Sequence, residues 1–279
     1  MSTTAGSTAG PTADPTPRRA GERVAAVVDL AAITANVRTL LALMRGSNPA
    51  GSVMAVVKAD GYGHGAVAAA QAALAGGATW LGVATPTEAL QLRAAGVDVP
   101  VLAWLWPPGE RVAPALAAGV QLAVASRAQL DRVLDQAVGA VPDIHVKVDT
   151  GLGRGGVGPA EIGAVLDAVA AAQRAGRVRV AGLMSHLASA DVPDDPSVPE
   201  QTATFHRILA AAADRGIDPP LRHLANTAGL IDHPATRFDL VRVGIGGYGL
   251  NPVATPVPLT PAMRSEERRV GKECATLCR

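Results

Sequence analysis

The chain has 279 residues, of which 48% are hydrophobic and 3% aromatic, and its formal net charge is +1. This balance argues against nucleic acid as a partner, because nucleic-acid binding needs basic patches or aromatic stacking platforms. No apolar run reaches the roughly 18 residues of a membrane span. Both cysteines, Cys274 and Cys278, stand near the end of the chain, so we expect a cytoplasmic protein without a disulfide framework, a metal site or a membrane partner.

The first residues predict no folded structure. Residues 1–21 are rich in Ser, Thr, Ala, Gly and Pro and lack the apolar segment of a secretory signal, which predicts a disordered leader. The next segment, Val24–Leu30, has the composition of a strand. It precedes a helix-like run, Ala31–Met44, for which Asp29 is a candidate N-cap.

From Val53 onward, short β-rich runs alternate with alanine-rich stretches of helical length. This alternation implies parallel strands joined by right-handed crossovers. Eight such units without a Rossmann glycine fingerprint favour a (β/α)8 TIM-type barrel, placed at residues 22–263, over an open doubly wound sheet. The strand candidates are Val53–Val57, Trp80–Ala84, Val99–Trp104, Gln121–Ala125, Asp143–Val148, Val178–Met184, Leu221–Leu224 and Leu240–Val243. Helical stretches include Thr87–Ala95, Ala128–Val138, Pro159–Ala175 and Glu200–Arg215.

Polar residues alternate with apolar ones inside two strand candidates. In the fifth candidate His145, Lys147 and Asp149 share one face, and Arg242 repeats the pattern in the last candidate. An exposed antiparallel strand would show the same alternation, but the last candidate is too apolar for the surface. Charged groups inside a barrel are unfavourable unless they are paired or used, so the pattern indicates a functional interior.

A single lysine, Lys58, ends the first strand candidate of the barrel and is followed by the turn-rich segment Ala59–Gly65. A lysine that loses water at the end of a buried strand can act as a neutral nucleophile. Such a lysine suits a Schiff base with an aldehyde cofactor. The alternative is a surface lysine that caps a strand.

The loops after the seventh and eighth barrel strands are the expected place for a phosphate in this fold. The first, His223–Ala228, offers amide and hydroxyl groups, and the second, Gly244–Gly249, lets backbone N–H groups approach an anion. Glycine-rich turns are common, so neither loop is decisive alone. Together they predict a phosphate site, and a phosphate near a strand-end lysine suggests pyridoxal phosphate.

Five motifs in this order carry a resemblance to the alanine racemases, which covers about Ala20 to Met263. The motifs are AVVKADGYGHG (Ala55–Gly65), HVKVDTGLGRGG (His145–Gly156), GLMSHLASAD (Gly182–Asp191), HLANTAG (His223–Gly229) and VRVGIGGYGL (Val241–Leu250). The resemblance implies a homodimeric, pyridoxal-phosphate-dependent enzyme that interconverts L- and D-alanine and supplies D-alanine for peptidoglycan.

The resemblance also implies catalytic roles. Lys58 would carry the cofactor covalently and act as the base for the D-enantiomer, and Tyr62 would reach the cofactor phosphate. Arg154 would lie near the phenolic oxygen and the substrate carboxylate. Lys147 matches a position where the family lysine is often carbamylated; unmodified, it would form an unfavourable like-charge pair with Arg154.

Further positions match the family's cofactor contacts. His186 would stack beside the pyridine ring, and Arg242, oriented by His223, would face the ring nitrogen. Because arginine stays protonated, that nitrogen would remain unprotonated, which should suppress transamination. The predicted phosphate and cofactor contacts are Asn226, Thr227, Gly244, Ile245 and Tyr248.

The resemblance ends at Met263, where the family continues into a β domain that supplies the second base, a tyrosine acting in the partner subunit. Arg264–Arg279 is instead polar, and its part Arg264–Cys274 can be back-translated into what resembles sequencing-adapter DNA, so we predict a non-native tail; a natural divergent tail is the alternative. We expect Val24–Leu30 to lack its sheet partners. We also expect weak cofactor binding, little racemisation and no stable dimer.

Two other functions fit the same motifs. One is a non-catalytic protein that binds pyridoxal phosphate on a bare barrel, although such a carrier needs neither Lys147 with Arg154 nor the strand Val24–Leu30. The other is a related barrel enzyme, either another amino-acid racemase or a decarboxylase. The motifs do not separate alanine from serine as substrate.

Overall fold

The computed structural model describes residues 24–267. They belong to two units, of which one is Val28–Met263 and the other comprises the two flanks of the chain. The described flanking residues lie in a two-stranded sheet of β1 (Val24–Val28) and β10 (Met263–Glu267). The predicted leader at residues 1–21 and both cysteines lie outside the described residues.

The expectation that the N-terminal strand lacks a partner is wrong. β1 pairs with β10, which contains the first four residues of the predicted non-native tail, Arg264–Glu267. The free N–H and C=O groups of an edge strand can pair with any extended segment that reaches them. The polar composition of the tail therefore did not indicate whether its first residues would pair with β1. The origin of the tail and the domain limits 22–263 stay predictions.

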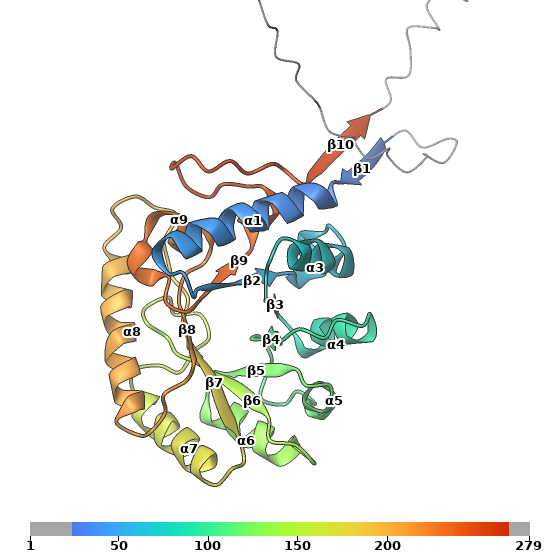
Figure 1. Cartoon of the computed structure of the whole chain (residues 1–279). Helices are drawn as coiled ribbons and strands as arrows, with labels where there is room; N and C mark the ends of the chain where they lie inside the picture. Colours follow the sequence, from blue (N-terminus) through green and yellow to red (C-terminus); the bar gives the residue numbers. More distant parts are fainter. Residues whose placement is uncertain (1–23, 268–279) are drawn as a thin grey trace, which may run out of the picture. The chain divides into compact units, whose positions relative to one another are not determined.

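Unit Val28–Met263 contains an eight-stranded parallel sheet with the order β8-β7-β6-β5-β4-β3-β2-β9. All eight strand candidates form, in chain order, and the helices lie outside them (Figure 1). This confirms the predicted (β/α)8 barrel. The strands are β2 (Ser52–Val56), β3 (Trp80–Val83), β4 (Val101–Ala103), β5 (Gln121–Val124), β6 (Asp143–Lys147), β7 (Arg179–Met184), β8 (Leu221–His223) and β9 (Leu240–Val243).

The two terminal strands of the sheet, β8 and β9, are joined by individual hydrogen bonds. Asp239 donates its backbone N–H to the Arg222 carbonyl, and Arg242 donates to the Ala225 carbonyl, both at 3.0 Å. The Asp239 carboxylate also accepts from the Arg222 backbone at 2.8 Å and from its guanidinium at 2.7 Å. The Asp239 contacts join the start of β9 to β8, and the Arg242–Ala225 bond brings the carboxyl ends of the two strands together.

Seven helices of the described chain connect or flank the strands. They are α1 (Leu30–Ser47), α3 (Ala66–Ala75), α4 (Pro86–Ala94), α5 (Ala113–Ala117), α6 (Arg127–Gln136), α7 (Ile162–Arg174) and α8 (Ser197–Ala213). Short helical turns add α2 (Lys58–Tyr62), α9 (Thr227–Asp232), η1 (Pro234–Thr236) and η2 (Ile245–Tyr248). α2, α9 and η2 follow directly on strands β2, β8 and β9, where the sequence predicted the site.

Side-chain caps determine where several helices begin. Asp29 accepts from the Ala32 N–H at 3.0 Å, which confirms the predicted N-cap of α1. Thr85 and Glu88 form a capping box at the start of α4. α8 begins three residues before its predicted start; Pro196 is its N-cap without a side-chain cap, and the preceding Asp195 accepts from the Ser197 N–H at 2.8 Å.

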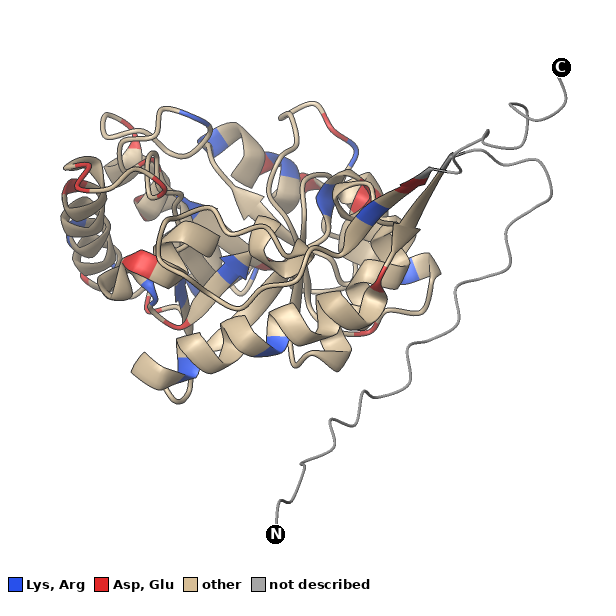
Figure 2. Cartoon of the chain, turned by 90° about the horizontal axis from the view of Figure 1, so that it is seen from above, with Lys and Arg blue, Asp and Glu red and all other residues tan. Residues whose placement is uncertain are grey.

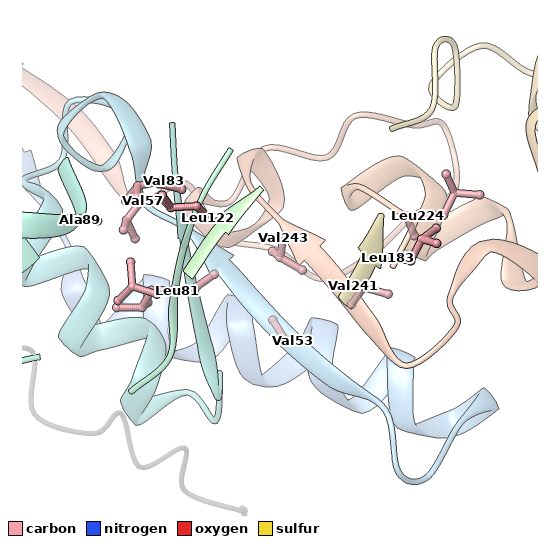
Figure 3. Packing of buried hydrophobic residues seen from close by; sticks show 14 of the residues in the cluster. Val53, Val57, Leu81, Val83, Ala89, Leu122, Leu183, Leu224, Val241 and Val243 are labelled. Atoms are coloured by element: carbon pink, nitrogen blue, oxygen red, sulfur yellow. The ribbon is translucent and has the colours of Figure 1, made fainter. Parts of the chain in front are cut away.

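Residues on the strands alternate between two apolar layers, as the strand period requires. One layer lies between strands and helices; it includes Val53 and Val241, which are paired in register on β2 and β9 and appear together in Figure 3. The other fills the barrel interior and consists of Met54, Leu102, Ala123, Met184 and Leu240. The interior layer closes the barrel beneath the polar side chains at its carboxyl end.

Basic and acidic residues are interspersed along the ribbon in the view of Figure 2. The described ion pairs are mostly exposed, such as Arg127 with Asp131, and exposed pairs add little stability. None of the helices in the described part of the chain has the length and apolar character needed to cross a membrane.

The side chain of Asn36 holds the loop after η2 in place, and a substitution at this position tests the role. Its buried side chain donates to the carbonyls of Thr260 (2.8 Å) and Gly247 (3.3 Å) and accepts from the Thr260 N–H (2.8 Å). Asn36→Ala leaves these groups without partners and should lower the free energy of unfolding by about 2–4 kcal/mol. Urea denaturation measures it. Asn48→Ala, at a more exposed asparagine, should cost less, and equal losses would contradict the proposed role of Asn36.

Candidate functional site

A cavity of about 600 Å³ opens at the carboxyl ends of the barrel strands. Its position agrees with the rule that TIM barrels bind their ligands at this end. Ten of the predicted site residues line it. They are Lys58, Tyr62, Lys147, Arg154, His186, Asn226, Thr227, Arg242, Gly244 and Ile245.

Lys58 enters the cavity from a left-handed turn. The residues after it have positive φ angles: 52° at Ala59, 52° at Asp60, 63° at Gly61 and 54° at Tyr62. This conformation costs about 1–2 kcal/mol for each residue with a Cβ atom. The turn brings Lys58 and Tyr62 to the same cavity, with the lysine Nζ 5.8 Å from the tyrosine ring centroid.

The other side of the cavity offers hydrogen-bond donors for an anion. The Thr227 hydroxyl accepts from the N–H groups of Gly244 (3.3 Å) and Gly246 (3.4 Å), which leaves its own proton free to donate. The backbone N–H groups of Thr227, Ala228 and Ile245 begin α9 and η2 and have no partner in the described part of the chain. These donors form a cradle for an oxyanion.

Gly244 lets this cradle meet Tyr62. A Cβ atom at Gly244 would lie 2.5 Å from the Tyr62 hydroxyl, so glycine is needed for the close approach. A tyrosine hydroxyl is protonated at neutral pH and can donate, and partial burial raises the pKa of Tyr62 further. Tyr62 therefore joins the lysine turn to the anion cradle.

Arg242 is buried on β9 and uses all but one of its donor positions inside the barrel. Nη1 donates to Nδ1 (3.0 Å) and to the carbonyl (2.9 Å) of His223, and Nη2 donates to the carbonyls of Ser185 (2.6 Å) and Leu224 (2.9 Å). His186 Nδ1 lies 3.2 Å from Nη2. Nε–H has no partner among the described residues. Burial lowers the pKa of Arg242 to about 10, so it stays charged at neutral pH and offers the cavity one donor.

A hydrogen-bonded relay continues from Arg242 through the barrel. His223 Nε2 lies 2.8 Å from His145 Nδ1, and His145 Nε2 lies 2.8 Å from Gln121 Oε1. Because Arg242 can only donate, His223 must carry its proton on Nε2, and His145 must then do the same. Burial, followed by the charge of Arg242, lowers the pKa of His145 to about 3 and that of His223 well below its usual value, so both rings are neutral.

The cavity is electropositive. Lys147 Nζ donates to the Arg154 carbonyl at 3.5 Å, and burial, then Arg242 and Arg154, lowers the pKa of Lys147 to about 8 against an opposing effect of Asp149. Burial and the same cations lower the pKa of His186 to about 3. The predicted proximity of Lys147 to Arg154 is confirmed, and such a cavity favours anionic ligands.

Two predicted cofactor contacts lie outside the cavity lining. His223 accepts from the Arg242 guanidinium on its Nδ1 atom, and its orienting role stays a prediction. Tyr248 instead donates its hydroxyl to the Val56 carbonyl at 3.1 Å and packs its ring 4.9 Å from that of Tyr62. Both residues touch groups that line the cavity, and neither lines it.

The sequence did not identify several lining residues. These are Val56, Ala84, Trp104, Leu105, Gly155, Met184, Asp191, Ala228 and Pro252. Five of them stand inside the motifs but received no predicted role: Val56, Gly155, Met184, Asp191 and Ala228. Most of the others are ordinary apolar residues near strand ends. Trp104 and Asp191 could have been found by extending the rule of strand ends to the loops after β4 and β7.

The eight parallel strands and the cavity at their carboxyl ends define a TIM barrel. Residues 28–252 match the family described as alanine racemase, N-terminal domain. The chain belongs to this family. Among the described residues, the match includes every strand of the barrel.

Individual relatives agree. The alanine racemase of Thermobifida fusca is 51% identical over 248 residues, covering 88% of this chain and 65% of that protein. That of Beutenbergia cavernae is 51% identical over 247 residues, covering 86% of this chain and 64% of that protein. The chain thus spans slightly less than two thirds of these relatives' length.

Solved structures share the fold. The alanine racemase of D-cycloserine-producing Streptomyces lavendulae superposes with a TM-score of 0.84 at 42% identity, over 88% of this chain and 65% of that one. The Bacillus anthracis alanine racemase, described with bound L-Ala-P, gives a TM-score of 0.78 at 31% identity, over 90% of this chain and 64% of that one.

The neutral state of His145 predicts how stability depends on pH. Because its folded pKa of about 3 is below the ordinary 6.5, the unfolded chain binds more protons between these values, and stability is lost as the pH falls through this window. His145→Gln should reduce the slope of unfolding free energy against pH by up to about 1.4 kcal/mol per pH unit. Urea denaturation at several pH values measures the slope.

Ile144→Val is the control, because it weakens core packing next to His145 without changing a titrating group. It should lower stability and leave the slope unchanged. If His145→Gln had the wild-type slope, the ring would not be neutral in the folded protein.

Proposed function

We propose that this chain is the cofactor-binding barrel of an alanine racemase and that its cavity holds pyridoxal phosphate. One observation carries the proposal: Lys58, the free Nε–H of Arg242 and the anion cradle line a single cavity. An aldehyde, a ring nitrogen and a phosphate on one cofactor would match these three groups. Each of the three has a chemical partner on pyridoxal phosphate.

The donors present fit the cofactor. The cradle of Thr227, Ala228 and Ile245, with the Tyr62 hydroxyl, would bind the phosphate. Arg242 has one N–H donor left, so the group it meets must be an acceptor, as an unprotonated pyridine nitrogen is. When bound, the cofactor supplies the electron sink that acidifies the α-hydrogen of an amino acid.

The protein's own groups would then move the proton. Lys58 would hold the cofactor and accept or return the proton on one face of the substrate. Racemisation also needs a proton donor on the opposite face, because one base tends to return the proton where it came from. The resemblance gives this role to a tyrosine of a further domain in a partner subunit, so homodimerisation is part of the proposal.

Lys147 and Arg154 support a racemase over a non-catalytic cofactor carrier. They line the cavity and add positive charge where a substrate carboxylate would lie. Alanine is the proposed substrate; the bound L-Ala-P described for the Bacillus anthracis relative supports an alanine-sized ligand. A cytoplasmic location is part of the proposal, and serine as substrate or another barrel activity is the alternative.

Covalent trapping tests the cofactor assignment. The sequence has three lysines, Lys58, Lys147 and Lys272. Borohydride reduction of the full chain with pyridoxal phosphate, followed by peptide mass spectrometry, should place the reduced pyridoxyl group on Lys58. Lys58→Arg should abolish the adduct, whereas Lys147→Met should retain it at Lys58. An adduct on another lysine of the wild-type chain would refute the proposal.

Carbamylation of Lys147 is a second prediction. A pKa of about 8 leaves more of the amine neutral at neutral pH than in an ordinary lysine. The neutral amine would attack the carbon of CO2 and release a proton, giving a carbamate anion beside Arg154. Native mass spectrometry in bicarbonate should show the mass of one added CO2, lost in Lys147→Met. An unmodified wild-type mass in bicarbonate would contradict this prediction.

A further inference from the structure

Glu88 connects two loops at the rim of the cavity. Its Oε2 accepts from the N–H groups of Ala84 (2.8 Å) and Thr85 (3.1 Å), and its own N–H donates to the Thr85 hydroxyl at 3.2 Å. These are the contacts of a capping box with one additional N–H. Its Oε1 accepts from the Ala59 N–H at 2.7 Å, in the loop after a different strand. Capping α4 does not require this last bond.

The bond to Ala59 lies where the backbone is most strained. Ala59 is the first residue of the left-handed turn after Lys58, and Asp60 and Tyr62 share its positive φ. Residues with a Cβ atom favour other conformations, so such a turn persists only where its surroundings hold it. The Ala59 N–H belongs to the peptide group that follows Lys58. The hydrogen bond to Glu88 holds this peptide group in place. It therefore also fixes the backbone conformation of Lys58, which sets the direction of the lysine side chain.

Other hydrogen bonds also hold the turn, among them one from the Gly63 N–H to the Ala59 carbonyl at 3.0 Å. The Asp60 carboxylate accepts from the Ala66 N–H at 2.7 Å, and the Gly61 N–H donates to the Val57 carbonyl at 2.9 Å. At Ala59 itself, Glu88 is the acceptor of the backbone N–H in the described structure. The side chain of Ala59 is exposed, so core packing does not hold this residue in place.

We propose that Glu88 is a positioning residue for Lys58: its carboxylate holds the left-handed turn so that the lysine faces the cavity before any ligand arrives. The inference rests on the proposed function, in which Lys58 binds the cofactor. Glu88 itself does not line the cavity and acts through the backbone. A carboxylate is required because three N–H groups converge on its two oxygens, whereas a glutamine would direct its NH2 group at one of these donors.

The test compares Glu88→Ala with Thr85→Ala in the full chain. Each variant removes one half of the capping box, but only Glu88→Ala also releases Ala59. The first readout is amide hydrogen exchange at Ala59 in cofactor-free protein. The second is the rate at which pyridoxal phosphate forms a borohydride-trappable adduct at Lys58. We expect Glu88→Ala to accelerate exchange and slow adduct formation, each about tenfold, and Thr85→Ala to change both less than about threefold.

A substitution in the turn separates positioning from helix capping. Ala59→Gly removes the Cβ penalty at positive φ without removing a buried side chain. Added to Glu88→Ala, it should restore part of the lost rate of adduct formation, which a mere capping role of Glu88 would not allow. If Glu88→Ala does not fold, Glu88→Gln should show the same two changes, faster exchange at Ala59 and slower adduct formation at Lys58, but to a smaller extent.

Two results would overturn the inference. One is wild-type exchange at Ala59 and wild-type adduct formation in the folded Glu88 variant. The other is equal impairment in Thr85→Ala, with no recovery on adding Ala59→Gly. Failure of the wild-type chain to form an adduct at Lys58 would instead refute the proposed function, and the exchange measurement would still report on the turn.

Discussion

The buried charge of Arg242 is the constraint on which the site depends. No carboxylate contacts this guanidinium in the described structure, so backbone carbonyls and a neutral imidazole must solvate it inside the barrel. These partners come from the ends of β7 and β8, while Arg242 comes from β9. Satisfying one cation therefore aligns three strand ends, and it leaves a single donor for the cavity.

The same charge determines the protonation of its neighbours. It lowers the pKa of His145, His223, His186 and Lys147, in each case adding to the effect of burial. Each neutral histidine accepts a hydrogen bond on one ring nitrogen and donates one from the other. The chain of hydrogen bonds from Arg242 to Gln121 therefore adds no further charge. An anionic ligand would relieve the excess of positive charge that this arrangement creates, which links the electrostatics of the barrel to the chemistry proposed for it.

The site combines side chains on rigid strands with a lysine on a strained turn. The strands and their two apolar layers hold Arg242, Lys147 and His145 in buried positions. Lys58, in contrast, leaves from a turn that the backbone does not favour, and hydrogen bonds from neighbouring loops hold that turn. Storing strain next to a reactive group is common in functional sites because a well-packed scaffold can sustain it.

The sequence by itself determined the barrel, most helix positions and the N-cap Asp29, because strand period and caps are local patterns. Roughly half of the lining residues were also predicted, mainly through the family resemblance that its motifs carry. The sequence did not reveal the pairing of β1 with β10, the withdrawal of Tyr248 from the cavity or the relay through His145 and Gln121. It also predicted a turn after Lys58 without its left-handed sense. Only the tertiary structure decided these, because each depends on groups far apart in the chain that local patterns do not bring together.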